Sequence, residues 1–222
     1  MSIITSREKE KEFPNQKGSW PTGSKRYVGN WHGANCQMDG KGTLKFYDGS
    51  VFKGVMKNSA MHSGTLKFPS SSKHHISTVA KGEEQVIDAA GLSDLLNEKW
   101  AEFKGEFKNN LPHSGAATLR FANGNEYFGQ FEEGMVNGAG QFLFAEPLLF
   151  NTYTTDNNNT QQSDSKKRRM IVSWFGEVQR NVLHGLVHLR FREQEELGYF
   201  MSVDKRCIME FDEGKWVSSK FY

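Results

Sequence analysis

The stretch Tyr127-Phe-Gly129-Gln-Phe131-Glu-Glu-Gly134, continued by Gly138-Ala-Gly140-Gln-Phe142-Leu-Phe144, decides the fold of this chain. Other copies of the phrase begin at Tyr27, Phe52, Phe103 and Trp174, and Phe103 precedes Tyr127 by 24 residues. Because aromatic residues and glycines alternate along each copy, they share one face of an extended strand. A phrase repeated at this interval predicts an array of successive β-hairpins, with tight turns such as Asp48-Gly49 between them.

The breaks in this array predict the organisation of the chain. Residues 83–102 carry apolar residues among acids, which indicates a short helical insertion between repeats. A polar run rich in Asn and Ser lies in 147–171 and predicts a mobile loop. We therefore expect the following segments: an extended polar arm (1–24), two clear repeats and a degenerate one near His75 (25–82), the helical insertion (83–102), further repeats (103–146), the polar mobile loop (147–171), and a repeat with a degenerate closing hairpin (172–222).

The repeated phrase resembles the MORN (membrane occupation and recognition nexus) repeat. The shared pattern is Tyr-x-Gly-x-Trp/Phe, followed by Gly-x-Gly-x-aromatic-x-aromatic and then Asp/Asn-Gly, and its copies cover roughly residues 27–215. Met56 and Val178 replace the second aromatic residue, while Ala117 and Val187 replace a glycine. The resemblance implies an all-β fold, an elongated, twisted, single antiparallel sheet of hairpins in which aromatic rings lie across glycines of adjacent strands.

The same resemblance implies a candidate partner-binding groove. One sheet cannot cover both of its own faces, so the ring ladder needs the insertion, a terminus or a partner to lie over it. The rings assigned both to the core and to this groove are Tyr27, Trp31, Phe52, Phe103, Phe107, Tyr127, Phe131 and Trp174.

Composition and charge narrow the class of partner. The formal net charge is +2 over 222 residues, so no strong overall field favours nucleic acid, and we expect none as a partner. Cys36 and Cys207 have no metal-ligand spacing, and we expect reduced thiols. The first residues lack a signal peptide's apolar run, and no window is long and apolar enough for a membrane span, so we expect a cytoplasmic protein.

No residue pattern predicts catalysis, a cofactor or a metal. His74-His75 has no accompanying ligand cluster, and the glycine pairs do not form a phosphate-binding loop. His62, His113 and His184 recur at equivalent positions of the repeat, which favours a structural role over a catalytic one. We therefore expect a protein that is not an enzyme.

The basic run Lys166, Lys167, Arg168 and Arg169 is a candidate contact for an anionic partner. It could serve as an anionic-lipid contact, a nuclear signal or a contact for acidic tubulin-like tails, or it could simply be solvated. The main expectation is a scaffold that binds other proteins in a larger complex, and the MORN resemblance points to the cytoskeleton, especially a cilium or flagellum. The alternative is a peripheral membrane adaptor that binds anionic phospholipid headgroups.

Overall fold

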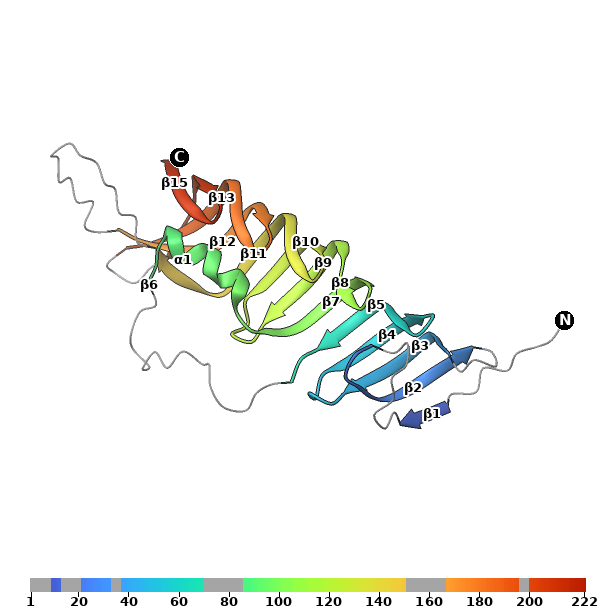
Figure 1. Cartoon of the computed structure of the whole chain (residues 1–222). Helices are drawn as coiled ribbons and strands as arrows, with labels where there is room; N and C mark the ends of the chain where they lie inside the picture. Colours follow the sequence, from blue (N-terminus) through green and yellow to red (C-terminus); the bar gives the residue numbers. More distant parts are fainter. Residues whose placement is uncertain (1–8, 13–20, 33–36, 70–85, 151–166, 196–199) are drawn as a thin grey trace. The chain divides into compact units, whose positions relative to one another are not determined.

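The computed structural model describes residues 9–12, 21–32, 37–69, 86–150, 167–195 and 200–222. Fifteen strands hydrogen-bond in the order β1-β2-β3-β4-β5-β7-β9-β10-β11-β12-β13-β14-β15, with β6 on β11 and β8 on β7. Except for the parallel β6–β11 pair, the neighbouring strands whose register is resolved run antiparallel. The predicted all-β antiparallel sheet with a short helical insertion is thereby confirmed (Figure 1).

The chain packs as two units. Unit 1 comprises residues 1–72, 100–122 and 130–135, and unit 2 comprises 73–99, 123–129 and 136–222, so β10 (Glu126–Glu132) and β11 (Met135–Phe150) contribute residues to both. The other strands of unit 1 are β1 (Lys9–Glu12), β2 (Ser24–His32), β3 (Gln37–Phe46), β4 (Val51–Lys57), β5 (Ala60–Lys67), β7 (Trp100–Lys108), β8 (Leu111–Pro112) and β9 (Ser114–Phe121). The other elements of unit 2 are β6 (Val86–Ile87), α1 (Ala89–Asp94), the 3-10 helix Leu95–Asn97, β12 (Lys167–Gln179), β13 (Val182–Glu195), β14 (Phe200–Asp212) and β15 (Lys215–Phe221).

A row of glycines crosses five strands of unit 1. The register pairs them in the order Gly29, Gly42, Gly54, Gly64, Gly105. Aromatic rings occupy the space above this bare backbone: a Cβ atom added to Gly42 would collide with the ring of Tyr27, and one added to Gly54 would collide with Phe52. The predicted arrangement of rings across glycines is therefore present.

Unit 2 repeats this arrangement in part. Gly140 pairs with Gly176, and the ring of Tyr127 fills the space over Gly140. The next strand carries Val187 opposite Gly176, one of the departures from the repeat pattern. A bulge follows directly, where the register of β13 slips between Gly176 and Glu177.

Within the described residues, five hairpins end in turns whose two central residues both have positive φ. This backbone is that of the type I′ turn, whose twist matches the twist of paired strands. The pairs are Asn58-Ser59, Asn109-Asn110, Glu133-Gly134, Arg180-Asn181 and Glu213-Gly214.

The second residue of each turn binds the backbone of the preceding hairpin. Asn181 donates its N–H to the Val136 carbonyl (3.0 Å), and its side-chain Oδ1 accepts from the Val136 N–H (2.7 Å). Ser59 makes the same two bonds to Met38, at 2.9 and 3.1 Å. We call each such contact a turn clamp. The remaining clamps join Asn110 to Met61, Gly134 to Pro112 and Gly214 to Leu183.

The two clamps that contain glycine lack the side-chain bond for different reasons. Gly134 faces Pro112, which has no N–H to satisfy. Gly214 faces Leu183, whose N–H instead donates to the Oγ of Ser93 in α1 (3.1 Å). Ser93 Oγ lies 3.2 Å from the place where a Cβ on Gly214 would stand. The helix thus supplies the hydroxyl that the last turn lacks.

The helical insertion covers part of unit 2. Asp88 caps α1 by accepting a hydrogen bond from the Gly91 N–H (2.9 Å), and the helix contacts β13 and β15 (Figure 1). Its apolar side chains are buried, namely Ile87, Ala89, Leu92, Leu95 and Leu96. The insertion therefore covers strands of its own chain.

Three predicted boundaries differ from the structure. Lys9–Glu12 of the predicted arm forms β1 and pairs with β2. Strand β11 continues through Phe150 and β12 begins at Lys167, because the apolar run Leu148–Phe150 pairs with Ile171, Met170 and β6. The predicted insertion 83–102 ends earlier, since β7 begins at Trp100. Residues 151–166 of the predicted loop and the degenerate repeat near His75 lie outside the described residues.

Candidate partner-binding face

The rings predicted to line an open groove form the core instead. Seven of them are at most 5% exposed: Tyr27, Phe52, Phe103, Phe107, Tyr127, Phe131 and Trp174. Trp31 is half-buried and packs edge-on against Tyr27, with the ring centroids 5.2 Å apart. The groove assignment is therefore corrected. The seven buried rings pack against glycine backbone and against one another, as Phe103 does with Phe131 at 4.9 Å, so a partner cannot reach them.

The basic run begins a strand and does not lie in a loop. Lys167, Arg168 and Arg169 are the first residues of β12, and Lys166 lies outside the described residues. The register places Lys167 opposite Glu195 and Arg169 opposite Glu193.

Strands β12–β15 expose a different set of side chains. Along β13, Leu186, His188 and Arg190 are exposed and alternate with the buried Val187 and Leu189. We call this the outer face and define it by Phe175 and Glu177 of β12, Leu186, His188 and Arg190 of β13, Arg206, Ile208 and Glu210 of β14, and Ser218, Lys220 and Tyr222 at β15.

Two large apolar side chains of the outer face are mostly in solvent. Phe175 is 54% exposed and Leu186 is 58% exposed. Phe175 pairs with His188, so Leu186 is its diagonal neighbour on the adjacent strand. Diagonal neighbours lie about 7–8 Å apart, which is within reach of an aromatic side chain. The two side chains therefore offer one apolar contact.

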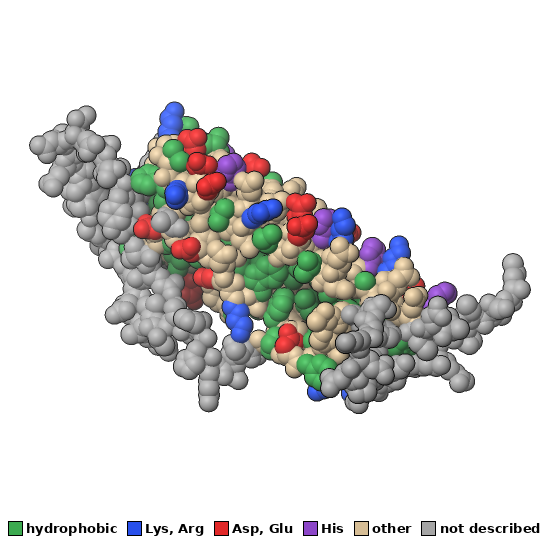
Figure 2. All heavy atoms as spheres, viewed as in Figure 1, with side chains coloured by type: hydrophobic (Ala, Val, Ile, Leu, Met, Phe, Trp, Pro, Cys, Tyr) green, Lys and Arg blue, Asp and Glu red, His purple; other side chains and the backbone are tan. Residues whose placement is uncertain are grey.

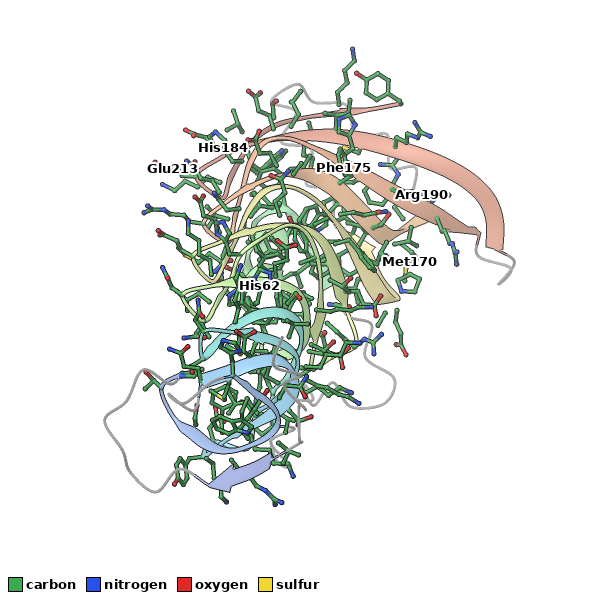
Figure 3. All side chains as sticks on the ribbon, turned by 90° about the vertical axis from the view of Figure 1, so that its right-hand side faces the viewer. His62, Met170, Phe175, His184, Arg190 and Glu213 are labelled. Carbon is green, nitrogen blue, oxygen red and sulfur yellow. The ribbon has the colours of Figure 1, made fainter. Side chains whose placement is uncertain are left out.

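Charge is distributed unevenly along the outer face. Glu177, Glu210, Asp212 and Glu213 lie toward the turns, whereas Arg190, Arg206 and Lys220 lie farther along the strands. Figure 3 shows Glu213 and His184 together at the turn end and Arg190 away from them. On the outer face itself, Glu177 and Glu210 therefore lie nearer the turns than Arg190 and Arg206 do.

The Cys207 thiol, whose pKa is shifted, lies on the opposite face of the same strands. Burial raises the pKa of the Cys207 thiol to about 11, although the backbone of Lys220 and the charge of Arg169 oppose this effect. Burial also raises the pKa of the Glu98 carboxyl, against a hydrogen bond from Asn123. Both shifts favour the neutral form; Cys207 is fully buried, whereas Glu98 is half-buried.

The recurrent histidines lie beside the turns. His62, His113 and His184 each follow the second residue of a turn by three positions. Figure 2 shows histidine side chains beside basic and acidic ones along one edge of the visible face. Within the described ranges, no three His, Cys, Asp or Glu side chains are placed to hold a metal ion. His74 and His75 lie outside the described residues.

Comparison with protein-family models and with curated proteins gives no match for this sequence. Within the part of the chain that the structure describes, no helix has the length and apolar character needed to cross a membrane.

Sequence reasoning did not single out the outer face. Phe175 and Arg190 occupy variable positions of the repeated phrase, and Arg206 lies in the degenerate closing hairpin. A signal was present, because in Leu189-Arg190-Phe191 a charged residue stands between two apolar ones. Arg190 lies opposite Arg206 because of the register between β13 and β14. The alternation of residues along one strand does not predict that register.

Proposed function

We propose that this protein is a non-enzymatic scaffold that binds protein partners through the outer face of β12–β15. The observation that carries the proposal is the exposed pair Phe175 and Leu186 on adjacent strands. Burial of a large apolar side chain contributes roughly 1.5–3 kcal/mol when it is complete. A partner that covers both side chains would gain a substantial part of that free energy from each.

The rest of the face suits a protein partner. Protein interfaces combine an apolar centre with a polar rim, and aromatic residues and arginine are enriched in them. Here Phe175 and Leu186 supply the centre, and His188, Arg190 and Glu177 surround it. The MORN resemblance of the repeats extends the proposal to a cytoskeletal assembly, in particular that of a cilium or flagellum.

The alternative role at an anionic membrane has less support. The basic run that suggested it has carboxylates at paired positions in β13, and the outer face also carries Glu177 and Glu210. A lipid surface broad enough to meet the arginines would also meet these acids.

Photo-crosslinking in native cells tests the proposal. A crosslinking amino acid placed at Phe175 should capture a partner protein, whereas the same residue at Tyr47, which is 57% exposed in unit 1, should not. Replacing Leu186 with Ser should weaken capture from position 175. Equal capture at both positions, or capture that is insensitive to Leu186→Ser, would contradict the outer face as the binding surface.

A further inference from the structure

Positive charge is concentrated in the first strands of unit 1. Residues 24–67, which contain β2–β5, carry seven Lys and Arg against two Asp. Residues 86–150 reverse this balance, with nine Asp and Glu against four Lys and Arg. The formal net charge of +2 for the whole chain therefore conceals a basic region and an acidic one.

Two lysines and a threonine of this region lie on one side of β3. Lys41, Thr43 and Lys45 alternate with Gly42 and Leu44, which lie on the side of the core. The alternation places the first three side chains together on the opposite side of the strand. Both lysines are exposed.

Strand β4 adds a third lysine on the same side. Lys53 is exposed and pairs with Thr43 of β3 and with Thr65 of β5. Because paired residues lie on the same side of a sheet, Lys53 stands between two threonine hydroxyl groups. We call the following residues the basic face: Lys41, Thr43, Lys45, Lys53 and Thr65.

The three lysines of the basic face lack the carboxylate that a neighbouring lysine has. Lys67 of β5 binds Glu102 Oε2 at 3.1 Å. Within the described ranges, the lysines of the basic face make no ion pair. Lys53 is a diagonal neighbour of Lys41 and of Lys45, and such neighbours lie about 7–8 Å apart. A bound anion would therefore reduce the repulsion among three cations.

The spacing of the lysines fits an extended chain. Since Lys53 is level with Thr43, Lys41, Lys53 and Lys45 follow one another along the strands at steps of two residues. Two residues of an extended chain span about 6.4–6.8 Å, and alternate side chains point to the same side. A segment that lies along β3 and β4 with an acid at every second position therefore presents one carboxylate to each lysine. Charge-assisted hydrogen bonds of this kind are stronger than those between neutral groups.

Acidic residues limit the length and the width of such a segment. Asp39 and Asp48 lie beyond the two ends of the lysine row on β3. Glu102 and Glu106 stand on either side of Lys104 in β7, the strand after β5. A membrane surface is wider than the basic face and would bring its negative charge to these acids as well.

The side chains around the lysines do not suit a single-stranded nucleic acid. Such ligands stack their bases on aromatic side chains. On this side of β3–β5, all of whose residues are described, the lysines have only threonine, serine and valine as neighbours across the strands, namely Thr43, Val51, Val55, Ser63 and Thr65. The observations therefore favour carboxylates of a protein.

We propose that the basic face binds an acidic segment of a partner protein, extended along β3 and β4 with acids at alternate positions. Its carboxylates contact Lys41, Lys53 and Lys45 in turn. The basic face lies in unit 1, whereas the outer face lies in unit 2. The inference thus adds a second contact surface to the proposed scaffold and does not depend on the first.

Fluorescence anisotropy of labelled peptides tests the inference with the full chain. The probe is Glu-Thr-Glu-Thr-Glu, and the matched peptide has glutamine in place of each glutamate. The triple variant Lys41→Gln, Lys45→Gln, Lys53→Gln should weaken probe binding about tenfold or more, because each exposed ion pair contributes about twofold to fivefold. A control variant, which should bind within about twofold of the native chain, removes the same charge outside the basic face: Lys108→Gln, Lys215→Gln, Lys220→Gln.

A thermal melt verifies that the variants remain folded. Without peptide, the triple variant of the basic face should melt no lower than the native chain, because its lysines make no ion pair within the described residues. The probe should raise the melting temperature of the native chain and of the control variant more than that of the triple variant. Equal binding of the glutamine peptide, or equal losses in the two variants, would overturn the inference.

Other anionic ligands are tested with the same variants. If phosphatidylserine vesicles bind through the three lysines while phosphatidylcholine vesicles and the acidic probe do not, a lipid surface is the ligand and the inference is overturned. Binding of single-stranded polyuridine through these lysines, without binding of the probe, would overturn it in the same way.

Crosslinking separates this inference from the proposed function. Capture of a partner from position 175 should persist in the triple variant, since the outer face is intact. Capture from position 175 without any probe binding would overturn the inference alone, and probe binding without capture would contradict the proposed function alone. The acidic segment ends at Lys45, because Asp48 repels further acids, so position 47 remains a valid control for position 175.

Discussion

The ring of Tyr27 occupies the space that a side chain on Gly42 would need. The ring is fully buried, and its hydroxyl group donates to the Asn30 carbonyl at 3.2 Å. Ring and glycine therefore depend on each other: the ring covers the bare backbone, and the missing Cβ lets the ring lie flat. This explains at the level of single residues why glycine and aromatic residues recur together in the sequence.

Gly42→Ala should destabilise unit 1. The new methyl group would collide with the buried Tyr27 ring, and overpacking of this kind typically costs about 1–3 kcal/mol. Gly115→Ala is the matched control, because a Cβ there meets nothing within 4 Å. Chemical denaturation should give a lower free energy of unfolding for Gly42→Ala and a nearly unchanged one for Gly115→Ala. Equal effects of the two substitutions would show that the ring does not fill this space.

The Cys207 thiol predicts a dependence of stability on pH. Its pKa in the folded chain is about 11 against a usual 9.0, so the folded state holds the proton more tightly. Its contribution to stability is complete below pH 9 and is lost as the pH rises through 11. The free energy of unfolding should fall more steeply between pH 9 and 11 for the native chain than for Cys207→Ala. Parallel curves would exclude this thiol as a cause.

At the scale of elements, the turn clamps link each turn to the preceding hairpin, and helix α1 takes part in the last of these contacts through Ser93. Each clamp satisfies backbone groups at the start of the second strand of one hairpin with the turn of the next hairpin. The positive φ that the turn requires favours the Asn and Gly residues at the second position, whereas Ser59 contributes the hydroxyl that accepts from the Met38 N–H. The position thus serves both the turn and the junction with the neighbouring hairpin.

Asn181→Gly isolates the side-chain part of one clamp. Glycine keeps the positive φ but leaves the N–H of the buried Val136 without its partner, which costs about 1–3 kcal/mol. Asn58→Gly, at the exposed first position of another turn, should be neutral or slightly stabilising, because it only relieves backbone strain. Urea denaturation of the two variants measures the difference, and a neutral Asn181→Gly would contradict the clamp.

A double-mutant cycle tests the role of Ser93. Ser93→Ala leaves the Leu183 N–H unpaired and should destabilise unit 2. Gly214→Asn alone should also destabilise it, because the new side chain meets Ser93 Oγ. Together the two changes should restore stability, since the asparagine can copy the bond that Asn181 makes to Val136. Additive losses in the cycle would show that Ser93 does not stand in for a turn side chain.

At the scale of the whole molecule, each hairpin pairs with the hairpins next to it in sequence. Stability in such arrays is approximately a sum of repeat terms and neighbour terms. A local defect should therefore weaken its surroundings more than distant strands. The chain also packs as two units, which gives a natural boundary for such effects.

Hydrogen exchange in Gly42→Ala should reveal this locality. Amides of β2–β4 should lose protection, because the collision lies on β3 and acts on its paired strands. Amides of β12–β14 in unit 2 should keep the protection they have in the native chain. Exchange measured by mass spectrometry distinguishes this result from a uniform loss, which would indicate one fully cooperative fold.

Much of this architecture could be predicted from the sequence. Alternation and turn residues located most of the hairpins, and the repeated glycines predicted where rings lie across backbone. The ring ladder was assigned to the core and to a groove at once, and burial of Phe103 and Trp174 leaves only the core. Sequence periodicity could not show this, because a ring facing a core and a ring facing a groove give the same pattern. The Arg190–Arg206 pair was missed because it depends on register.

The turn clamps also set the order in which backbone hydrogen bonds can form during synthesis. Every residue that a turn clamps lies earlier in the sequence than the turn, as Met38 precedes Ser59 and Val136 precedes Asn181. During synthesis from the first residue onward, each hairpin therefore waits for its successor before its backbone is fully bonded. Leu183 is the exception in one respect, because Ser93 has already been made when Leu183 emerges. A growing chain can thus close the side-chain bond of its last clamp before its last turn exists.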